Sequence, residues 1–245
     1  MKKGDLVSRI KYNHDIVFRI TDINNGVATL KGECIRLIAD APLEDLVIST
    51  KVEEPHEIEI EFLRESKMIN GSVLHIDGDE KYLKKSLDVY KKHGVPCIGY
   101  HLKESEVPNQ ITNLLVKHKP DILVITGHDN YKRGENDEEI FENSDYFISA
   151  VKKARIYQAD KDALVIFAGA CQSYYEGIIE SGANFAASPS RKNINVLDPV
   201  YIAISVARGY IDRYLDIEKI LKNTVSKGEG LGGIDTRGVA KKLYH

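Results

Sequence analysis

The chain has 245 residues, of which 42% are apolar, enough to bury one full-sized core and a small second one. Its net charge of −3 gives no support to a nucleic-acid partner, and no apolar run approaches the length of a membrane-spanning helix. Its three scattered cysteines exclude a disulfide framework or a zinc site, and with no signal-peptide pattern they indicate a reducing compartment inside the cell.

Short β-type runs separated by turn signals fill the first fifty residues. We expect strands over residues 6–7, 16–20, 27–30, 35–39 and 46–48, with Asn24-Asn25-Gly26 as a hairpin turn. Five such strands predict a small SH3-like β-barrel over residues 1–50. A role in docking a partner and a role in packing alone explain this pattern equally well.

Residues 51–70 are interpreted as a linker or bridging segment. The run is rich in charge and contains Glu53-Glu54-Pro55, which is typical of a connection between domains. Four apolar residues would also allow a strand or short helix that bridges the domains: Ile58, Ile60, Phe62 and Met68.

Strands and helices alternate regularly over residues 71–245, which predicts a single α/β domain. Buried strands are expected at 73–76, 95–100, 122–126, 163–167 and 183–187, with helices between them and after them at 199–207 and 217–225. Residues 131–139 are expected to form a mobile loop over the site, and Asn143 or Ser144 to cap the next helix. The glycines from 228 to 238 are expected to form a flexible loop, not a nucleotide site.

Two carboxylates, Asp77 and Asp79, follow the first of these strands. They suggest either a Mg²⁺ site or the cap of the next helix, and capping is the preferred interpretation.

Cys171 follows a strand that has no polar alternation, so we expect it at the carboxyl end of a buried strand, where open α/β sheets place their sites. Ser173 and Glu176 match a capping box, which would begin a helix just past the thiol and favour the thiolate. The alternative is a buried structural cysteine.

A nucleophilic cysteine needs a base, and His128 is the best placed histidine. It ends a second buried strand 43 residues before Cys171, enough for one return helix and one strand. With the sheet order 2-1-3-4, His75 would lie about 10 Å and His101 about 14 Å from Cys171 across the sheet, and His128 only about 5 Å. His245 is the terminal residue and a poor candidate.

These two strand ends resemble the clan of cysteine peptidases that includes caspases, legumain and clostripain. Four stretches together are similar to the YabG family of sporulation peptidases: Thr126-Gly127-His128-Asp129, the run 168–173, the run 182–191 and the run 231–238. The resemblance covers nearly the whole chain. It implies a caspase-like, mainly parallel sheet between helices, and a cysteine endopeptidase that cleaves after arginine in spore coat and cortex-associated proteins. It also implies that the protein acts in the cytoplasm of the mother cell of a sporulating bacterium.

The resemblance also implies where substrate binds. Residues 188–193 would lie beside the cleaved bond, which makes Ser188, Ser190 and Arg191 candidate substrate-binding residues. A basic substrate side chain needs a carboxylate partner, for which Asp198 is the first candidate and Glu176 the second. Capping of the helix that begins at Pro199 explains Asp198 equally well.

In the mechanism that we expect, His128 takes the proton of Cys171, and the backbone N–H of Cys171 with that of Gly127 or Asp129 stabilises the oxyanion. Most clan members have glycine where Asp129 stands, so the freedom of a glycine is missing there. No cofactor or metal is expected. Two other classes remain open: a flavodoxin-like binding or receiver domain that uses Asp77 and Asp79, and a non-catalytic spore assembly protein.

Overall fold

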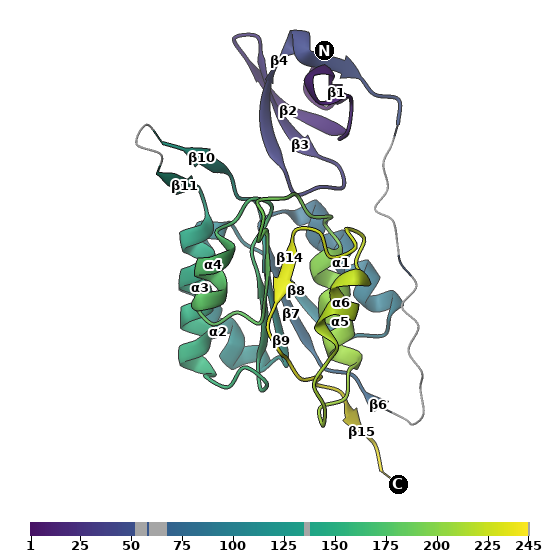
Figure 1. The fold of residues 1–245 in the computed structure, drawn as a ribbon, viewed down its shortest axis with the longest axis vertical. Coiled ribbons are helices and arrows are strands. Elements are labelled where there is room, and N and C mark those ends of the chain that lie inside the picture. Colours follow the sequence, from purple (N-terminus) through teal and green to yellow (C-terminus); the bar gives the residue numbers. More distant parts are fainter. Residues whose placement is uncertain (52–57, 59–67, 135–137, 245) are drawn as a thin grey trace.

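The computed structural model describes residues 1–51, 58, 68–134 and 138–244. A small antiparallel sheet built from the first fifty residues lies above a larger layered part, in which helices cover both faces of a central sheet (Figure 1). Residues Ile60 and Phe62, two of the four expected to bridge these parts, lie outside the described residues. Ile58 is described, and its N–H donates to the Tyr201 hydroxyl at 2.8 Å.

The small sheet has the five strands expected from the sequence. They run in the order β4-β3-β2-β1-β5, and the turn between β2 and β3 places Asn25 at φ 49° and Gly26 at φ 81°, as a tight hairpin requires. The bounds are β1 Leu6–Arg9, β2 Phe18–Asn24, β3 Val27–Gly32, β4 Ile38–Pro42 and β5 Leu46–Ile48, with 3-10 turns η1 Ile10–Tyr12 and η2 Leu43–Asp45. The fourth strand begins at Ile38 and not at Ile35, because residues 33–37 turn toward the larger part. The SH3-like barrel stays a prediction.

The central sheet has six strands in the order β14-β13-β12-β9-β7-β8. The first five along the chain are parallel, so the expected order 2-1-3-4 is confirmed. Their bounds are β7 Val73–Asp77, β8 Cys97–His101, β9 Ile122–Thr126, β12 Val165–Ala168, β13 Phe185–Ala187 and β14 Leu231–Gly233. The flexible glycine loop expected near the end of the chain is wrong in part, since Gly232 and Gly233 belong to β14, antiparallel to β13.

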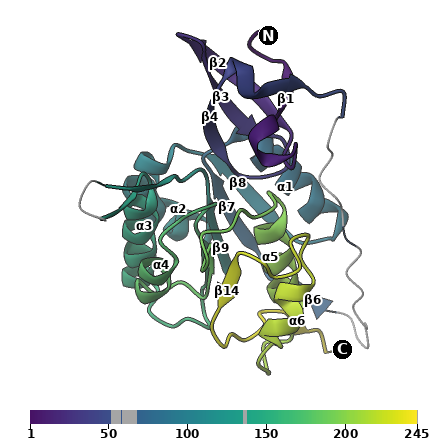
Figure 2. The ribbon, with the colours of Figure 1, turned by 45° about the horizontal axis from the view of Figure 1, so that its top comes forward.

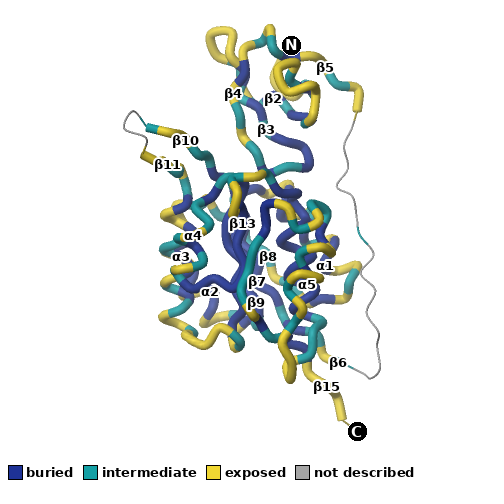
Figure 3. The backbone as a smooth tube through the Cα atoms, in the orientation of Figure 1, coloured by how far each residue is buried: buried dark blue, intermediate teal, exposed yellow. Residues whose placement is uncertain are grey.

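Helices cover each face of this sheet and form two cores (Figure 2). On one face lie α2 Val107–His118, α3 Ser144–Tyr157 and α4 Tyr175–Glu180, with the 3-10 turn η3 Glu104–Glu106 before α2; on the other lie α1 Glu80–Lys92, α5 Asp198–Arg208 and α6 Ile217–Lys222. Every residue of β7, β9, β12 and β13 is buried, as expected for strands covered on both faces, and the polar residues His75, Asp77 and Thr126 are buried with them (Figure 3).

Two further pairs of strands lie outside the main sheets. The expected loop at residues 131–139 is wrong in part, because β10 Tyr131–Arg133 and β11 Glu139–Phe141 pair as a hairpin. The rings of Phe141 and Tyr174 stack at 5.2 Å between centroids, which ties this hairpin to the segment before α4. β6 Met68–Ile69 pairs with β15 Lys241–Lys242. Within the described ranges, no helix is both long enough and apolar enough to cross a bilayer.

Candidate active site

His128 and Cys171 follow the carboxyl ends of two neighbouring parallel strands, β9 and β12. In the register of β9 and β12, Ile125 pairs with Ala168, and each site residue stands three positions further along its own chain. Because the strands are parallel, both chains leave the sheet at the same carboxyl edge. The expected juxtaposition of these two strand ends is therefore confirmed.

The chain turns sharply around Cys171. Gly169 has φ 110° and Gln172 has φ 64°, both in the left-handed region. Ser173 accepts from Ala170 N–H at 2.9 Å and donates to Asp129 at 2.9 Å. The predicted capping box of Ser173 and Glu176 is therefore wrong: the Ser173 hydroxyl serves the turn itself, and α4 begins at Tyr175 without a side-chain cap.

Asp129 fastens the histidine loop to the cysteine loop. Its buried carboxylate accepts from the hydroxyls of Ser144 and Ser173 at 2.5 and 2.9 Å, and from the Asn143 N–H at 2.8 Å. Burial raises the pKa of Asp129, and these hydrogen bonds offset part of that rise. The expected cap of α3 takes another form, since the Asn143 side chain donates to the His128 carbonyl at 2.9 Å and the Ser144 hydroxyl serves Asp129.

His128 is held from both sides. Its N–H donates to Glu104 Oε1 at 2.7 Å, and its ring Nε2 lies 3.1 Å from Asp79 Oδ2. A Cβ added at Gly127 would contact the Glu104 carboxylate, so a larger residue there would have to displace the side chain that binds the His128 N–H. Because an ionised carboxylate only accepts, Nε2 carries a hydrogen, so in the neutral imidazole the lone pair is on Nδ1. Nδ1 is buried and has no hydrogen-bond partner within the described part of the chain.

Asp79 joins three elements at this point. It caps α1 by accepting from Lys81 N–H at 2.9 Å and Tyr82 N–H at 3.2 Å, which confirms the capping interpretation. Its other oxygen binds both His128 and the Lys31 ammonium of the small sheet. Burial alone would raise the pKa of Asp79, but the bonds from His128 and Lys31 outweigh it and hold that pKa below its usual value. No sequence pattern connects Asp79 with His128.

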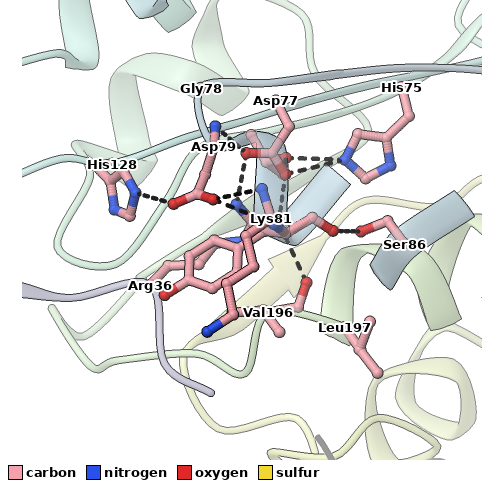
Figure 4. Close-up of polar contacts among 12 residues, drawn as sticks. Arg36, His75, Asp77, Gly78, Asp79, Lys81, Ser86, His128, Val196 and Leu197 are labelled. Carbon is pink, nitrogen blue, oxygen red and sulfur yellow. Dashed lines mark hydrogen bonds and ion pairs between the residues drawn. The ribbon is translucent and has the colours of Figure 1, made fainter. Parts of the chain in front are cut away.

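Asp77 forms an ion pair with a buried arginine, Arg36. Both nitrogens at the end of Arg36 donate to it, at 3.0 and 2.7 Å, and neither side chain is exposed (Figure 4). Thr126 Oγ1 and the N–H of Asp79 also donate to Asp77, each at 2.9 Å. Burial raises the pKa of Asp77, but the charges and hydrogen bonds of Arg36 and His75 outweigh burial and hold it below the usual range.

The Cys171 thiol is fully buried. Ile194 N–H donates to Sγ at 3.2 Å, and the Arg36 backbone N–H also lowers the pKa of the thiol. Burial outweighs both and raises that pKa to about 12. The expectation that the thiolate is favoured is therefore wrong for this arrangement, because the thiol lies under other chain segments and the helix that follows is short and begins four residues later.

The two carboxylates predicted to bind a basic substrate have other partners. Asp198 is buried and accepts from Asn195 N–H at 2.8 Å and Ser226 N–H at 3.2 Å, and burial raises its pKa. It stands in the first turn of α5 beside Pro199. Glu176 is half-exposed and binds Arg191 at 3.3 Å.

The segment predicted to line the substrate site follows β13. Ser188 is buried, and its hydroxyl accepts from Gln172 N–H at 2.9 Å, next to Cys171. Arg191 binds Glu139 and Glu176 and lies 5.1 Å above the centre of the Phe141 ring, while Ser190 is exposed. This segment therefore contacts the cysteine loop and the β10–β11 hairpin.

The other histidines have separate environments. His75 is buried between Tyr90 and Thr126, and burial lowers its pKa. His101 is exposed, with its ring 3.3 Å from the Gly78 carbonyl. His245 lies outside the described residues.

A cavity of about 480 Å³ lies between the small sheet and the large part. Leu37 and Ile38 contribute to it from the small sheet, and Asn130, Gln172 and Asn193 from the large part. Gln172 adjoins Cys171 in the chain and Asn130 is two residues after His128, so this cavity reaches the loops that hold both.

The carboxylates first considered for Mg²⁺ already bind cations of the protein. Arg36 forms an ion pair with Asp77, and Lys31 forms one with Asp79. Over the described residues, no group of three or more His, Cys, Asp or Glu side chains is arranged to hold a metal ion.

Known proteins match nearly the whole chain. The family model described as YabG peptidase U57 matches residues 2–70 and 59–245. The sporulation-specific protease YabG of Bacillus subtilis (strain 168) is 42% identical over an alignment of 277 residues, covering 97% of this chain and 96% of that protein.

Proposed function

The chain belongs to the YabG peptidase family, and on that premise we propose that it is a cysteine endopeptidase with Cys171 as nucleophile and His128 as base. The observation that carries this proposal is the register of β9 and β12, from which both residues leave the sheet three positions past a paired residue. Thiol and imidazole are the two groups that this chemistry requires.

The hydrogen bonds around His128 assign its roles. With Nε2–H donating to Asp79, Nδ1 is the nitrogen that takes the Cys171 proton and later gives it to the leaving amine. The thiolate attacks the peptide carbonyl, the C–N bond breaks as the thioester forms, and water then hydrolyses the thioester.

Backbone N–H groups are proposed to stabilise the oxyanion. The N–H of Gln172 already donates to Ser188, and that of His128 to Glu104, so neither is free for this role. The N–H of Cys171, with that of Gly127 or Asp129, is therefore the proposed donor pair, at roughly 3 kcal/mol per donor.

We further propose that the substrates are proteins of the spore coat and cortex, cut after arginine during sporulation, in the cytoplasm of the mother cell. The name of the Bacillus subtilis relative supports the sporulation role. We propose an SH3-like barrel over residues 1–50, a linker over 51–70 and a caspase-like domain over 71–245. The strand orders of the two sheets support this division. Ser188, Ser190 and Arg191 are proposed to line the substrate groove.

Substitution of the three cysteines one at a time tests the nucleophile. Cys171→Ala should abolish cleavage of a protein substrate, and it should cost only about 1 kcal/mol of stability, since it leaves the Ile194 N–H without its acceptor. Cys97→Ala is the matched control and should retain activity; Cys34→Ala should not abolish it. Residual cleavage by Cys171→Ala would overturn the assignment.

A further inference from the structure

The loop between β3 and β4, residues 33–37, is held as a closed hairpin tip. Gly32 N–H donates to the Leu37 carbonyl at 2.9 Å, and Glu33 N–H donates to the Val17 carbonyl at 3.0 Å. From the large part, the Tyr82 hydroxyl donates to the Gly32 carbonyl and Lys81 binds Glu33 at 2.8 Å. The loop is therefore fastened at its base and presents residues 34–36 to the carboxyl edge of the central sheet.

These residues pair with the chain beside Cys171 as an added strand does. Ile35 forms an antiparallel bridge with Asn195, and Val196 N–H donates to the Cys34 carbonyl at 3.1 Å. The Arg36 N–H faces the Cys171 thiol. An extended polypeptide bound at the site would use the same backbone groups of residues 194–196.

The Arg36 side chain fills a pocket built for a guanidinium. Besides its two bonds to Asp77, it donates to the Val196 carbonyl at 3.2 Å, and it is fully buried (Figure 4). A fork of two parallel hydrogen bonds to a carboxylate matches arginine and not lysine. Asp77 is in turn oriented by Thr126, two residues before His128, so the pocket adjoins the proposed base.

We propose that residues 34–36 occupy the substrate groove as a substrate would, with Arg36 in the pocket for the residue that precedes the cleaved bond and Asp77 as the carboxylate that selects arginine. This inference rests on the proposed function. It assigns to Asp77 the role first expected of Asp198 or Glu176. It follows that a substrate must displace the loop, and that the chain is latent while the loop is docked.

Arg36→Gln tests the latency. Removing the guanidinium should free the groove, so the apparent KM for a peptide ending in arginine amide should fall with little change in kcat. If the loop leaves the groove open in about one molecule in a hundred of the parent chain, the apparent KM should fall about 100-fold in Arg36→Gln. Arg213→Gln is the control, because Arg213 is exposed and its guanidinium binds its neighbour Asp212 and lies over the Tyr210 ring. An unchanged KM in Arg36→Gln would overturn the latency.

A second arm needs no catalysis. In a Cys171→Ala background, agmatine, a small alkylguanidine, is titrated by calorimetry. The proposal predicts no binding to Cys171→Ala alone, binding after Arg36→Gln is added, and loss of that binding when Asp77→Asn is added as well. Asp198→Asn in place of Asp77→Asn should leave the binding intact. Agmatine that binds without the Arg36 change, or that still binds without the Asp77 carboxylate, would overturn the pocket.

The agmatine titration and the cysteine substitutions distinguish the pocket at Asp77 from the assignment of Cys171 as nucleophile. If Cys171 is not the nucleophile, the agmatine pattern still appears although the cysteine variants do not behave as proposed. If the pocket is wrong, Cys171-dependent cleavage persists and the agmatine pattern is absent. Should Arg36→Gln fail to fold, Arg36→Lys replaces it. Lysine keeps the positive charge but cannot form the two parallel hydrogen bonds to Asp77, so the loop is only partly released and the KM should fall, but by less than for full release of the loop.

Discussion

Asp79→Asn separates the two tasks of Asp79, capping α1 and orienting His128. Asn and Asp cap helices about equally well, so the bonds from Lys81 and Tyr82 should persist. The charge that holds His128 Nε2–H is lost, and the amide can turn its own N–H toward the ring. A general base contributes about 10²–10⁴-fold to rate, and losing its orientation should remove about 100-fold of that, or about 2.7 kcal/mol of barrier.

The stability cost of Asp79→Asn should be smaller than its catalytic cost. One charge-assisted hydrogen bond is weakened, worth about 1.5–3 kcal/mol at most, and the Lys31 partner is partly exposed, which screens its share. We expect a loss of about 1–2 kcal/mol. Urea unfolding and kcat/KM on a peptide with arginine before the cleaved bond measure the two effects.

Asp216→Asn is the matched control for this experiment. Asp216 caps α6 by accepting from Lys219 N–H at 3.0 Å, so the same substitution is made at a helix cap that does not contact His128. Equal kcat/KM values for Asp79→Asn and Asp216→Asn would refute the positioning role.

Three further substitutions test other parts of the site. Asp129→Asn should cost about 2–4 kcal/mol in urea unfolding and reduce kcat/KM, because it weakens the bond from Ser173 of the cysteine loop and the bond from Ser144 of α3; unchanged activity at intact folding would contradict the coupling. Arg191→Ala should raise KM while costing under about 1 kcal/mol, since its ion pairs are solvent-exposed; an unchanged KM would remove it from the groove. The destabilisation caused by Asp77→Asn should be largest at neutral pH and shrink below about pH 4. The folded pKa of Asp77 lies below its ordinary value of 3.8, so the stabilising effect of the carboxylate is complete above that ordinary value and is lost as the pH falls from it through the folded pKa. A pH-independent difference between the two unfolding curves would contradict this assignment.

The sheet and the two strand ends could be predicted because local pattern decides them. Apolar runs with no alternation mark strands that are buried on both faces, and the spacing from His128 to Cys171 admits only one return helix. Asp79 was correctly interpreted as a cap. Its bond to His128 could not be foreseen, since a capping carboxylate has a second oxygen whose partner depends on tertiary packing.

The arginine pocket could not be predicted, because its occupant comes from the other sheet. Asp198 and Glu176 follow Cys171 closely in the sequence, whereas Asp77 lies at the end of an earlier strand. The sequence did contain a signal: Arg36 stands alone between the apolar residues Ile35 and Leu37, which is unusual for a solvent-exposed loop. Only the packed structure shows that this loop reaches the edge of the central sheet.

The glycine-rich end was misjudged for a related reason. Gly232 and Gly233 were interpreted as loop glycines, but a Cβ at either position would collide with an aromatic ring, of Tyr175 or Phe185 respectively. Glycine is thus needed there to let β14 approach its neighbours, and a sequence pattern does not distinguish that need from flexibility.

Covalent labelling tests the central claim, that Cys171 is the nucleophile and His128 its base. The chain is incubated with a peptidyl-arginine chloromethyl ketone and the adduct is located by peptide mass spectrometry, in the parent chain and in His128→Ala. We predict one adduct, on Cys171, that forms far more slowly without His128. An adduct on Cys34 or Cys97, or equal rates with and without the histidine, would contradict the account.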